Sequence, residues 1–136
     1  MYLSRLSSQM KFAFLELELY LSKTDGKLSN DEKQLINAHC NEMRIDHNYY
    51  QNDMSLEEVF EMIKDASTEE QRIIYFEIVQ LVMADNLYHQ NEREFMQPLE
   101  GVLGMDQNEI QTVFDMVSSY RNLMTQIDSF IFDVEE

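Results

Sequence analysis

Residues 73–94 read IIYFEIVQLVMADNLYHQNERE, and this stretch decides the fold. Over residues 73–83 only Glu77 and Gln80 are strongly polar, so a helix there is apolar almost all the way round. Such a helix belongs in the middle of a helical bundle. The stretch then turns acidic at Asp85 before a second, more polar helix begins. It therefore predicts a buried helix, an acidic loop and a second helix.

A similar stretch occurs 60 residues earlier in the chain. Residues 24–33, TDGKLSNDEK, correspond to residues 84–93, ADNLYHQNER, and each segment follows an apolar run. A fixed offset between similar segments indicates an internal repeat. We therefore predict two related halves, over about 3–60 and 63–120, and a C-terminal helix over about 121–134.

Length and composition favour one all-helical domain. The chain has 136 residues with only three Gly and one Pro, and its frequent Leu, Glu, Met and Gln favour helix over sheet. A chain of this length buries roughly two-thirds of its unfolded surface. We predict a single domain over residues 1–136, folded as a compact bundle of about seven helices. Residues 107–134 form either one helix or two.

Local signals place the helix ends. Residues 15–21, LELELYL, alternate as a strand does, but Leu and Glu are strong helix formers and no β-branched residue occurs, so we predict a helix over 3–22. Pro98 predicts a kink or local break in the helix that begins near Asn91. An acidic or hydroxyl residue with a Glu three positions later marks a capped helix start. We expect helix starts of this kind at Ser29 with Glu32, Ser55 with Glu58, Ser67 with Glu70, and Asp106 with Glu109.

The net charge is −16 and it is unevenly distributed. Residues 1–46 hold six Lys or Arg against seven Asp or Glu, whereas residues 47–136 hold four against nineteen. Direct nucleic-acid binding and attraction to an anionic membrane are disfavoured, because both need a basic face. The sequence also shows neither a signal peptide nor a membrane span. We expect a cytoplasmic protein whose partners are cations or basic proteins.

The two acidic loops are the candidate binding sites, with Asp25, Asp31 and Glu32 in the first and Asp85 and Glu92 in the second. Calcium, magnesium and manganese prefer several oxygen ligands, which carboxylates and loop carbonyls supply. The spacing is not that of an EF-hand, because Glu32 stands only seven residues after Asp25. These residues are therefore candidate ligands of a divalent cation.

A second interpretation of the loops stays open, since the same residues also end and begin helices. Gly26 after Asp25 suits a helix C-terminus, and a capping pair starts the next helix. In the second loop Gly26 becomes Asn86 and Ser29 becomes His89, yet the spacing of seven from Asp to Glu is kept. That retained spacing is an argument for metal binding, and both interpretations stay open.

Other chemistries find little support. His39 corresponds to Leu99 in the repeat, which predicts a core-edge histidine, and Cys40 on the same face reads as a small buried residue. No His follows a Glu by three positions, as a di-iron bundle requires. No glycine-rich phosphate loop, nucleophile elbow or cysteine pair is present. The sequence therefore does not predict an enzyme.

The repeated order of apolar helix, Ala or Thr, Asp, Gly, polar residues, Glu and a basic residue resembles the TerB-like family of bacterial tellurite-resistance and stress-response proteins. The resemblance covers residues 10–120 and falls on Asp25, Gly26 and Glu32, then on Asp85 and Glu92. Where the family usually has Gly, the second copy has an Asn.

The resemblance implies an all-helical domain of two halves with an acidic metal-binding role. It also implies work in a cytoplasmic stress-response assembly with protein partners, without catalysis and without membrane insertion. Tellurite itself is not implied as the relevant stress. The alternative function is an acidic interaction module that binds a basic protein or mimics nucleic acid, because residues 47–136 carry most of the negative charge.

Overall fold

The fold is all-helical, as the composition predicts. A computed structural model describes residues 1–22, 30–45, 54–83 and 90–133, with the side chains of residues 31 and 90–93 outside that description. The described residues contain no strand. They form a 3-10 turn and six α-helices: η1 (Leu3–Arg5), α1 (Ser8–Ser22), α2 (Asn30–Met43), α3 (Leu56–Lys64), α4 (Thr68–Val82), α5 (Gln90–Val102) and α6 (Gln107–Phe132).

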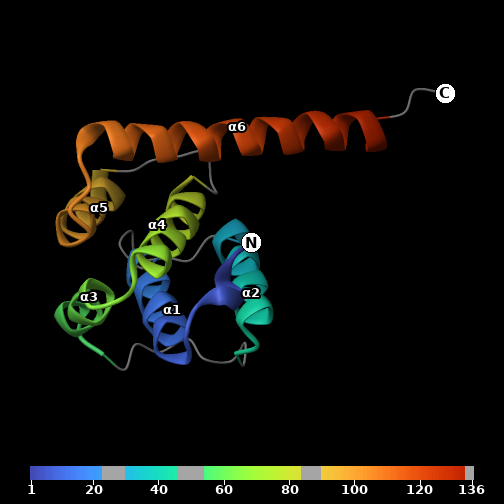
Figure 1. The fold of residues 1–136 in the computed structure, drawn as a ribbon. Helices are drawn as coiled ribbons and strands as arrows, with labels where there is room; N and C mark the ends of the chain where they lie inside the picture. Colours follow the sequence, from blue (N-terminus) through green and yellow to red (C-terminus); the bar gives the residue numbers. More distant parts are fainter. Residues whose placement is uncertain (23–29, 46–53, 84–89, 134–136) are drawn as a thin grey trace.

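Helices α1 and α4 lie at the centre of the molecule. α1 packs against α2, α3 and α4, while α4 also packs against η1 and α6. Figure 1 shows α2 and α3 on opposite sides of this central pair and the long α6 running across its end. α5 contacts α3 and precedes α6. The two most apolar helices are thus covered by the others.

The alternating segment of α1 is helical and buried on nearly every side. Ten of the fifteen residues of α1 are buried, including two glutamates, Glu16 and Glu18. A half-buried strand would hide only every second side chain. The Leu and Glu residues are therefore used for their helix propensity, and the even spacing of Leu reflects a helix without a solvent-facing stripe.

The central placement predicted for residues 73–83 is confirmed. Eight residues of α4 are buried, and Ile74, Ile78 and Val79 have no exposed surface. The side chain of Glu77 is also fully buried. Because α4 is covered on most faces, its one central carboxylate has nowhere to reach solvent.

Capping follows the sequence signals where the structure describes them. Capping boxes form at Ser55 with Glu58 and at Asp106 with Glu109. At Ser67 the side chain accepts the N–H of Glu70, but the Glu70 carboxylate accepts the hydroxyl of Ser67 and the N–H of Ser7. The reciprocal bond expected there is thus replaced by one that ties α4 to the start of α1. The pair at residues 29 and 32 begins outside the described residues.

The ends of α2 and α5 share one geometry. Arg44 has φ 61° and Gly104 has φ 65°, so both adopt the left-handed conformation that closes a helix. Beyond them, Ile45 donates to the Cys40 carbonyl and Met105 to the Glu100 carbonyl, which satisfies helix-end acceptors. An Arg at such a position carries backbone strain that a Gly avoids.

The described residues form six α-helices where the sequence predicted about seven, because residues 107–132 form one helix. The segment contains neither Gly nor Pro, so nothing in it breaks the backbone. α5 also runs through Pro98 without the predicted local break.

The helix bounds fit the predicted offset of the repeat. α1 (Ser8–Ser22) and α4 (Thr68–Val82) begin and end 60 residues apart. α2 and α5 likewise begin at Asn30 and Gln90. The structural equivalence of the two halves remains a prediction.

Among the helices that the structure describes, none combines the length and the apolar character that a membrane crossing requires.

Candidate functional site

The predicted metal ligands fall at the boundaries of four helices. Asp25 and Asp85 lie outside the described residues, between α1 and α2 and between α4 and α5. Asp31 and Glu92 fall in the first turns of α2 and α5, with side chains that are likewise outside the description. Glu32 is described and is buried, with 5% of its surface exposed. Of the five candidates, the structure therefore gives the surroundings of Glu32 alone.

The burial of Glu32 separates it from other glutamates at the same helical position. Glu32, Glu58 and Glu109 are each the third residue of their helices, α2, α3 and α6. Glu58 and Glu109 are exposed and complete capping boxes, whereas Glu32 faces the interior. Burying a carboxylate is costly unless it is paired or coordinates a metal, and Glu32 does take part in an interaction. Helix capping alone does not require that burial.

A second buried ionisable group lies deeper, at the contact of α1, α2 and α4. The Nδ1 atom of His39 is 2.7 Å from Oε2 of Glu18, and its Nε2 is 3.5 Å from Oε2 of Glu77. All three side chains are at most 4% exposed. The edge of the Phe14 ring packs against the imidazole, with 5.4 Å between ring centroids. We call Glu18, His39 and Glu77 the Glu–His cluster.

The Glu–His cluster retains protons. Burial raises the pKa of Glu18 from 4.5 to about 7, against the opposing effect of the His39 hydrogen bond and charge. Burial alone would lower the pKa of His39, but the hydrogen bond and charge of Glu18, together with the charge of Glu77, raise it above 6.5 overall. The cluster is closed to solvent, so what it can do is hold a proton and fix the packing of three helices.

The α-amino group of Met1 lies against the same helices. It is 2.7 Å from Oε1 of Glu42 and 3.2 Å from Oε2 of Glu77. Glu42 also accepts the N–H of Leu3 at 2.7 Å. Partial burial would raise the pKa of Glu42, but its bonds to the amino group and to Leu3 hold that pKa below 4.5. Two carboxylates on different helices thus share one cation at η1.

Unsatisfied polar atoms gather in the last two turns of α1 and α4. Among the described residues, buried side-chain atoms without a hydrogen-bond partner are Oε1 of Glu18, Oγ of Ser22, Oε1 of Glu77 and Nε2 of Gln80. These turns directly precede the two acidic loops in sequence. Buried polar atoms of this kind are normally satisfied by ordered water or by an ion. The helix ends that lead into the loops therefore offer polar atoms that a water molecule or an ion could contact.

The sequence prediction missed the Glu–His cluster, although a signal was present. Glu18 has Phe14, Leu15 and Leu21 at helical spacing, so no face of α1 offers it solvent. Glu77 was noted only as a break in an apolar helix. His39 is buried, as its alignment with Leu99 predicts, and Cys40 is also buried, as predicted. The paired carboxylate of His39 was not foreseen.

We expect the stability of the protein to fall as the pH rises from 5 to 8. The folded-state pKa values of Glu18 and His39 are raised, so the folded state binds more protons than the unfolded state above the unfolded carboxyl pKa near 4.5. Each extra proton lowers the free energy of unfolding by about 1.4 kcal/mol per pH unit. Thermal unfolding by circular dichroism at several pH values measures this slope.

At lower pH we expect the opposite dependence, in which the stability of the protein falls as the pH falls. The pKa values of Glu42 and Glu70 are lowered in the folded state, so their stabilisation is lost as the pH falls below 4.5.

The matched control for the predicted slope between pH 5 and 8 is the double variant Glu18→Ile/His39→Leu, which should flatten that slope. A wild-type melting temperature that stays constant or rises over that range would contradict the proton balance.

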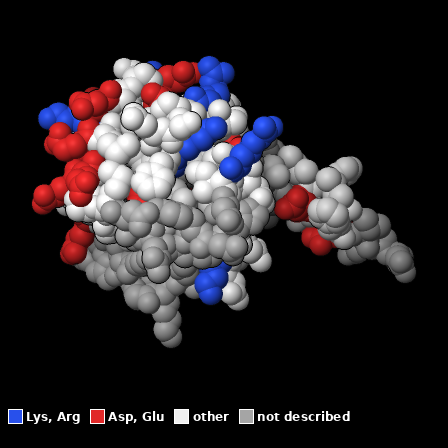
Figure 2. All heavy atoms as spheres, turned by 90° about the horizontal axis from the view of Figure 1, so that it is seen from below, with Lys and Arg blue, Asp and Glu red and all other residues white. Residues whose placement is uncertain are grey.

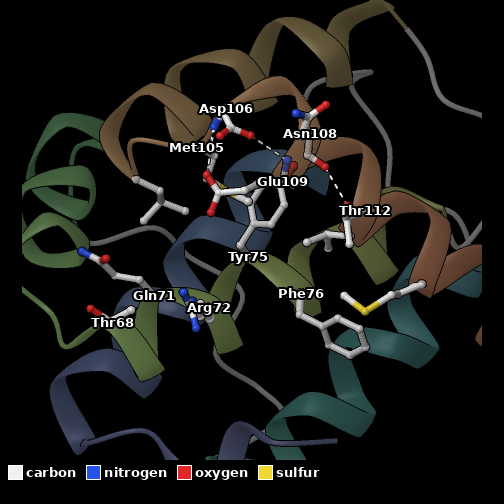
Figure 3. A pocket seen from close by; sticks show the side chains of 13 residues that line it. Thr68, Gln71, Arg72, Tyr75, Phe76, Met105, Asp106, Asn108, Glu109 and Thr112 are labelled. Carbon is white, nitrogen blue, oxygen red and sulfur yellow. Dashed lines mark hydrogen bonds between the residues drawn. The ribbon is translucent and has the colours of Figure 1, made fainter.

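A groove of about 730 Å³ lies between α4 and the start of α6. Figure 3 shows the residues around this groove, among them Arg72, Tyr75 and Phe76 of α4 and, at the start of α6, Asp106 and Glu109. The carboxylates there are committed to the capping box. The Tyr75 hydroxyl donates to Glu100 at 2.6 Å.

The geometry of three or more His, Cys, Asp or Glu side chains that a metal centre needs is not found within the described part of the chain. The Glu–His cluster therefore does not form such a centre by itself. The predicted centre in the loops stays a prediction, because four of its five candidate side chains are not described.

Comparisons with known proteins give one structural likeness. No family model and no curated protein matches the chain. A solved structure described as a tellurite resistance protein from Nostoc punctiforme is similar, with a TM-score of 0.70 over 96% of this chain and 85% of that one. The two sequences are 17% identical, so the likeness shows a shared fold.

Proposed function

We propose that this chain is a TerB-like, non-enzymatic domain that binds a divalent cation at its two acidic loops and acts in a bacterial stress-response assembly. The shared fold with a protein described as a tellurite resistance protein supports the TerB-like assignment. The loops that resemble the family's motif supply Asp25, Glu32, Asp85 and Glu92. The ligand chemistry favours calcium, magnesium or manganese, because all the candidate ligands are carboxylates.

The burial of Glu32 is the observation that carries the proposal. As the third residue of α2 it would serve a capping box equally well if it were exposed, as Glu58 and Glu109 are. Its inward position brings a carboxylate to the start of the helix that follows the first loop. The unsatisfied oxygens of Glu18 and Ser22, in the last turns of α1, add polar atoms on the other side of that loop in sequence. A cation between the loop and the helix ends would give the unsatisfied oxygens of Glu18 and Ser22 a partner.

We expect Glu32→Gln to weaken cation binding at least tenfold, since it removes one charged ligand. Isothermal titration calorimetry of chelator-stripped protein with calcium, magnesium and manganese measures the dissociation constants. Glu58→Gln is the matched control: it removes the same charge from the same position of an exposed helix start. Circular dichroism confirms that both variants fold. Equal losses in the two variants would reduce the effect to general charge, and unchanged binding in Glu32→Gln would remove that residue from the site.

A second candidate function is the acidic interaction module, and the distribution of charge on the surface favours it. Helix α3 and its C-cap expose four carboxylates, Glu57, Glu58, Glu61 and Asp65. In Figure 2 acidic atoms gather on the side of the body where Figure 1 places α3 and α5. A basic partner on this side would bind with a steep dependence on salt.

A titration with a defined peptide distinguishes the two proposed functions. A Lys-rich peptide titrated against the wild-type chain and against a Glu57→Gln/Glu61→Gln variant tests the acidic face. Binding that falls with salt and with the variant, in a protein that takes up no cation, would favour the interaction module over the metal site.

A further inference from the structure

The C-terminal half of α6 leaves the body of the molecule. Val117 is fully buried where α6 packs on α4, but the helix continues for another four turns beyond it (Figure 1). Apolar side chains on that half are exposed, with Phe130 at 87% and Leu123 at 54%. We call the following six residues the exposed face of α6: Tyr120, Leu123, Met124, Ile127, Phe130 and Ile131.

The exposed face continues the same seam that packs on the body. From Val117 the apolar residues step through Tyr120, Met124, Ile127 and Ile131, at alternating intervals of three and four residues. That spacing is the a and d pattern of a coiled coil, in which each apolar residue inserts between residues of a facing helix. One end of the seam is covered by α4, and no described element covers the other.

The charge on this half of α6 tells which kind of helix would face it. Residues 116–132 hold one Arg and one Asp, so this stretch is neutral in a chain of net charge −16. A second copy can therefore approach here without the repulsion that the rest of the surface would create. A membrane surface is disfavoured, because an interfacial helix carries Lys and Arg along its polar side and this one has a single Arg. A basic partner is disfavoured as well, because residues 116–132 contain only one carboxylate.

The flanking positions of the seam fix the orientation of the two copies. With Val117 at position a, Arg121 and Asp128 occupy e, and Leu123 and Phe130 occupy g. In an antiparallel pair e faces e and g faces g. Arg121 then meets Asp128 of the second copy, and Leu123 meets Phe130. A parallel pair would set g against e and place Leu123 against Asp128, so the antiparallel arrangement is favoured on both flanks.

We propose that the protein forms a two-fold symmetric dimer in which the C-terminal halves of α6 pair antiparallel. Met124 packs opposite Ile127 of the second copy, and Tyr120 packs opposite Ile131. Because the interface is isologous, each copy contributes both members of the Arg121 and Asp128 pair, and two such ion pairs form. The paired stretch, from Tyr120 to Ile131, is about 18 Å long. This surface is separate from the acidic loops, so the dimer does not depend on metal binding.

Sedimentation velocity on the full chain at physiological salt tests the interface. The wild type should sediment as a dimer at submillimolar concentration. Ile127→Asp, which places a charge in the seam at an exposed position, should raise the dissociation constant at least tenfold. Ser119→Asp adds the same charge at an exposed position of α6 away from the seam and should leave the dimer intact. A wild type that stays monomeric at every concentration would overturn the proposal, as would equal weakening by the two variants.

A charge exchange tests the orientation. Arg121→Asp and Asp128→Arg should each weaken the dimer, because each places like charges opposite one another twice. The double variant Arg121→Asp/Asp128→Arg restores the opposite charges in an antiparallel pair and should restore the dimer. A double variant as weak as the single variants would exclude the antiparallel register.

Discussion

His39→Leu is expected to lower the free energy of unfolding by about 3–5 kcal/mol at pH 8, because it leaves a buried carboxyl without its partner. Glu18 is fully buried and lies 2.7 Å from Nδ1 of His39. Without the imidazole, both states of Glu18 are costly at pH 8. The carboxyl must either ionise in a nonpolar interior or stay protonated at a pH that favours loss of the proton. At pH 5 Glu18 is protonated in the folded state, since its pKa is already about 7 with His39 present. The destabilisation should therefore shrink at pH 5, as urea unfolding at both values would show.

The repeat supplies the rescue for this variant. At an offset of 60 residues, Ile78 stands where Glu18 does and Leu99 where His39 does. The double variant Glu18→Ile/His39→Leu should regain most of the lost stability, because replacing both members of a buried ion pair by apolar residues is often neutral or stabilising. A double variant as unstable as His39→Leu would mean that the loss comes from packing and not from the carboxyl.

Phe14→Ala is expected to cost about 3–5 kcal/mol, the range for removing a fully buried aromatic ring. Phe14 has no exposed surface, lies in the central helix α1 and packs its edge against His39. The cavity would open beside the Glu–His cluster, where collapse of the surrounding helices is restricted by the ion pair. Urea unfolding at pH 6 measures the loss. Gln97→Ala on the exposed side of α5 is the control and should change stability by less than about 0.5 kcal/mol. Similar values for both variants would contradict the central position of α1.

The architecture was predictable because it depends on the hydrophobic pattern of each helix, which can be read directly from the sequence. Residues 73–83 are apolar around the whole helix, which is possible only inside a bundle, and α4 is buried accordingly. The alternating Leu residues of α1 could have been misread as a strand, and helix propensity together with the lack of β-branched residues decided for a helix. The number of helices was left open. Residues 107–132 contain no Gly or Pro that would break a helix, but no pattern in them requires one helix of that length.

The interior charges were harder to predict. Periodicity shows that Glu18 and Glu77 lie on apolar helices, but not that both face one histidine from a third helix. That juxtaposition depends on how α1, α2 and α4 pack, and His39 was placed in the core only through Leu99 of the repeat. The α6 seam shows the converse case, since its spacing is visible in sequence while its exposure beyond α4 is visible only in the fold.

The loops mark the other limit. Spacing identifies Asp25, Glu32, Asp85 and Glu92 as a repeated set, and the same spacing serves a helix stop and a helix start. The burial of Glu32 goes beyond what punctuation needs.

The most direct measurement is a calorimetric titration of chelator-stripped protein with calcium, magnesium and manganese at physiological ionic strength. It compares the wild type with Asp25→Asn/Asp85→Asn and with Glu57→Gln/Glu61→Gln, which removes two exposed carboxylates of α3. We predict saturable binding of one of these ions, lost in the loop variant and kept in the α3 variant. At one hundred times the dissociation constant that ion should stabilise the fold by about 2.7 kcal/mol. Equal binding in all three proteins would contradict a cation site in the loops, and no binding in the wild type would contradict cation binding itself; either result would leave Asp25 and Asp85 as residues that only end helices.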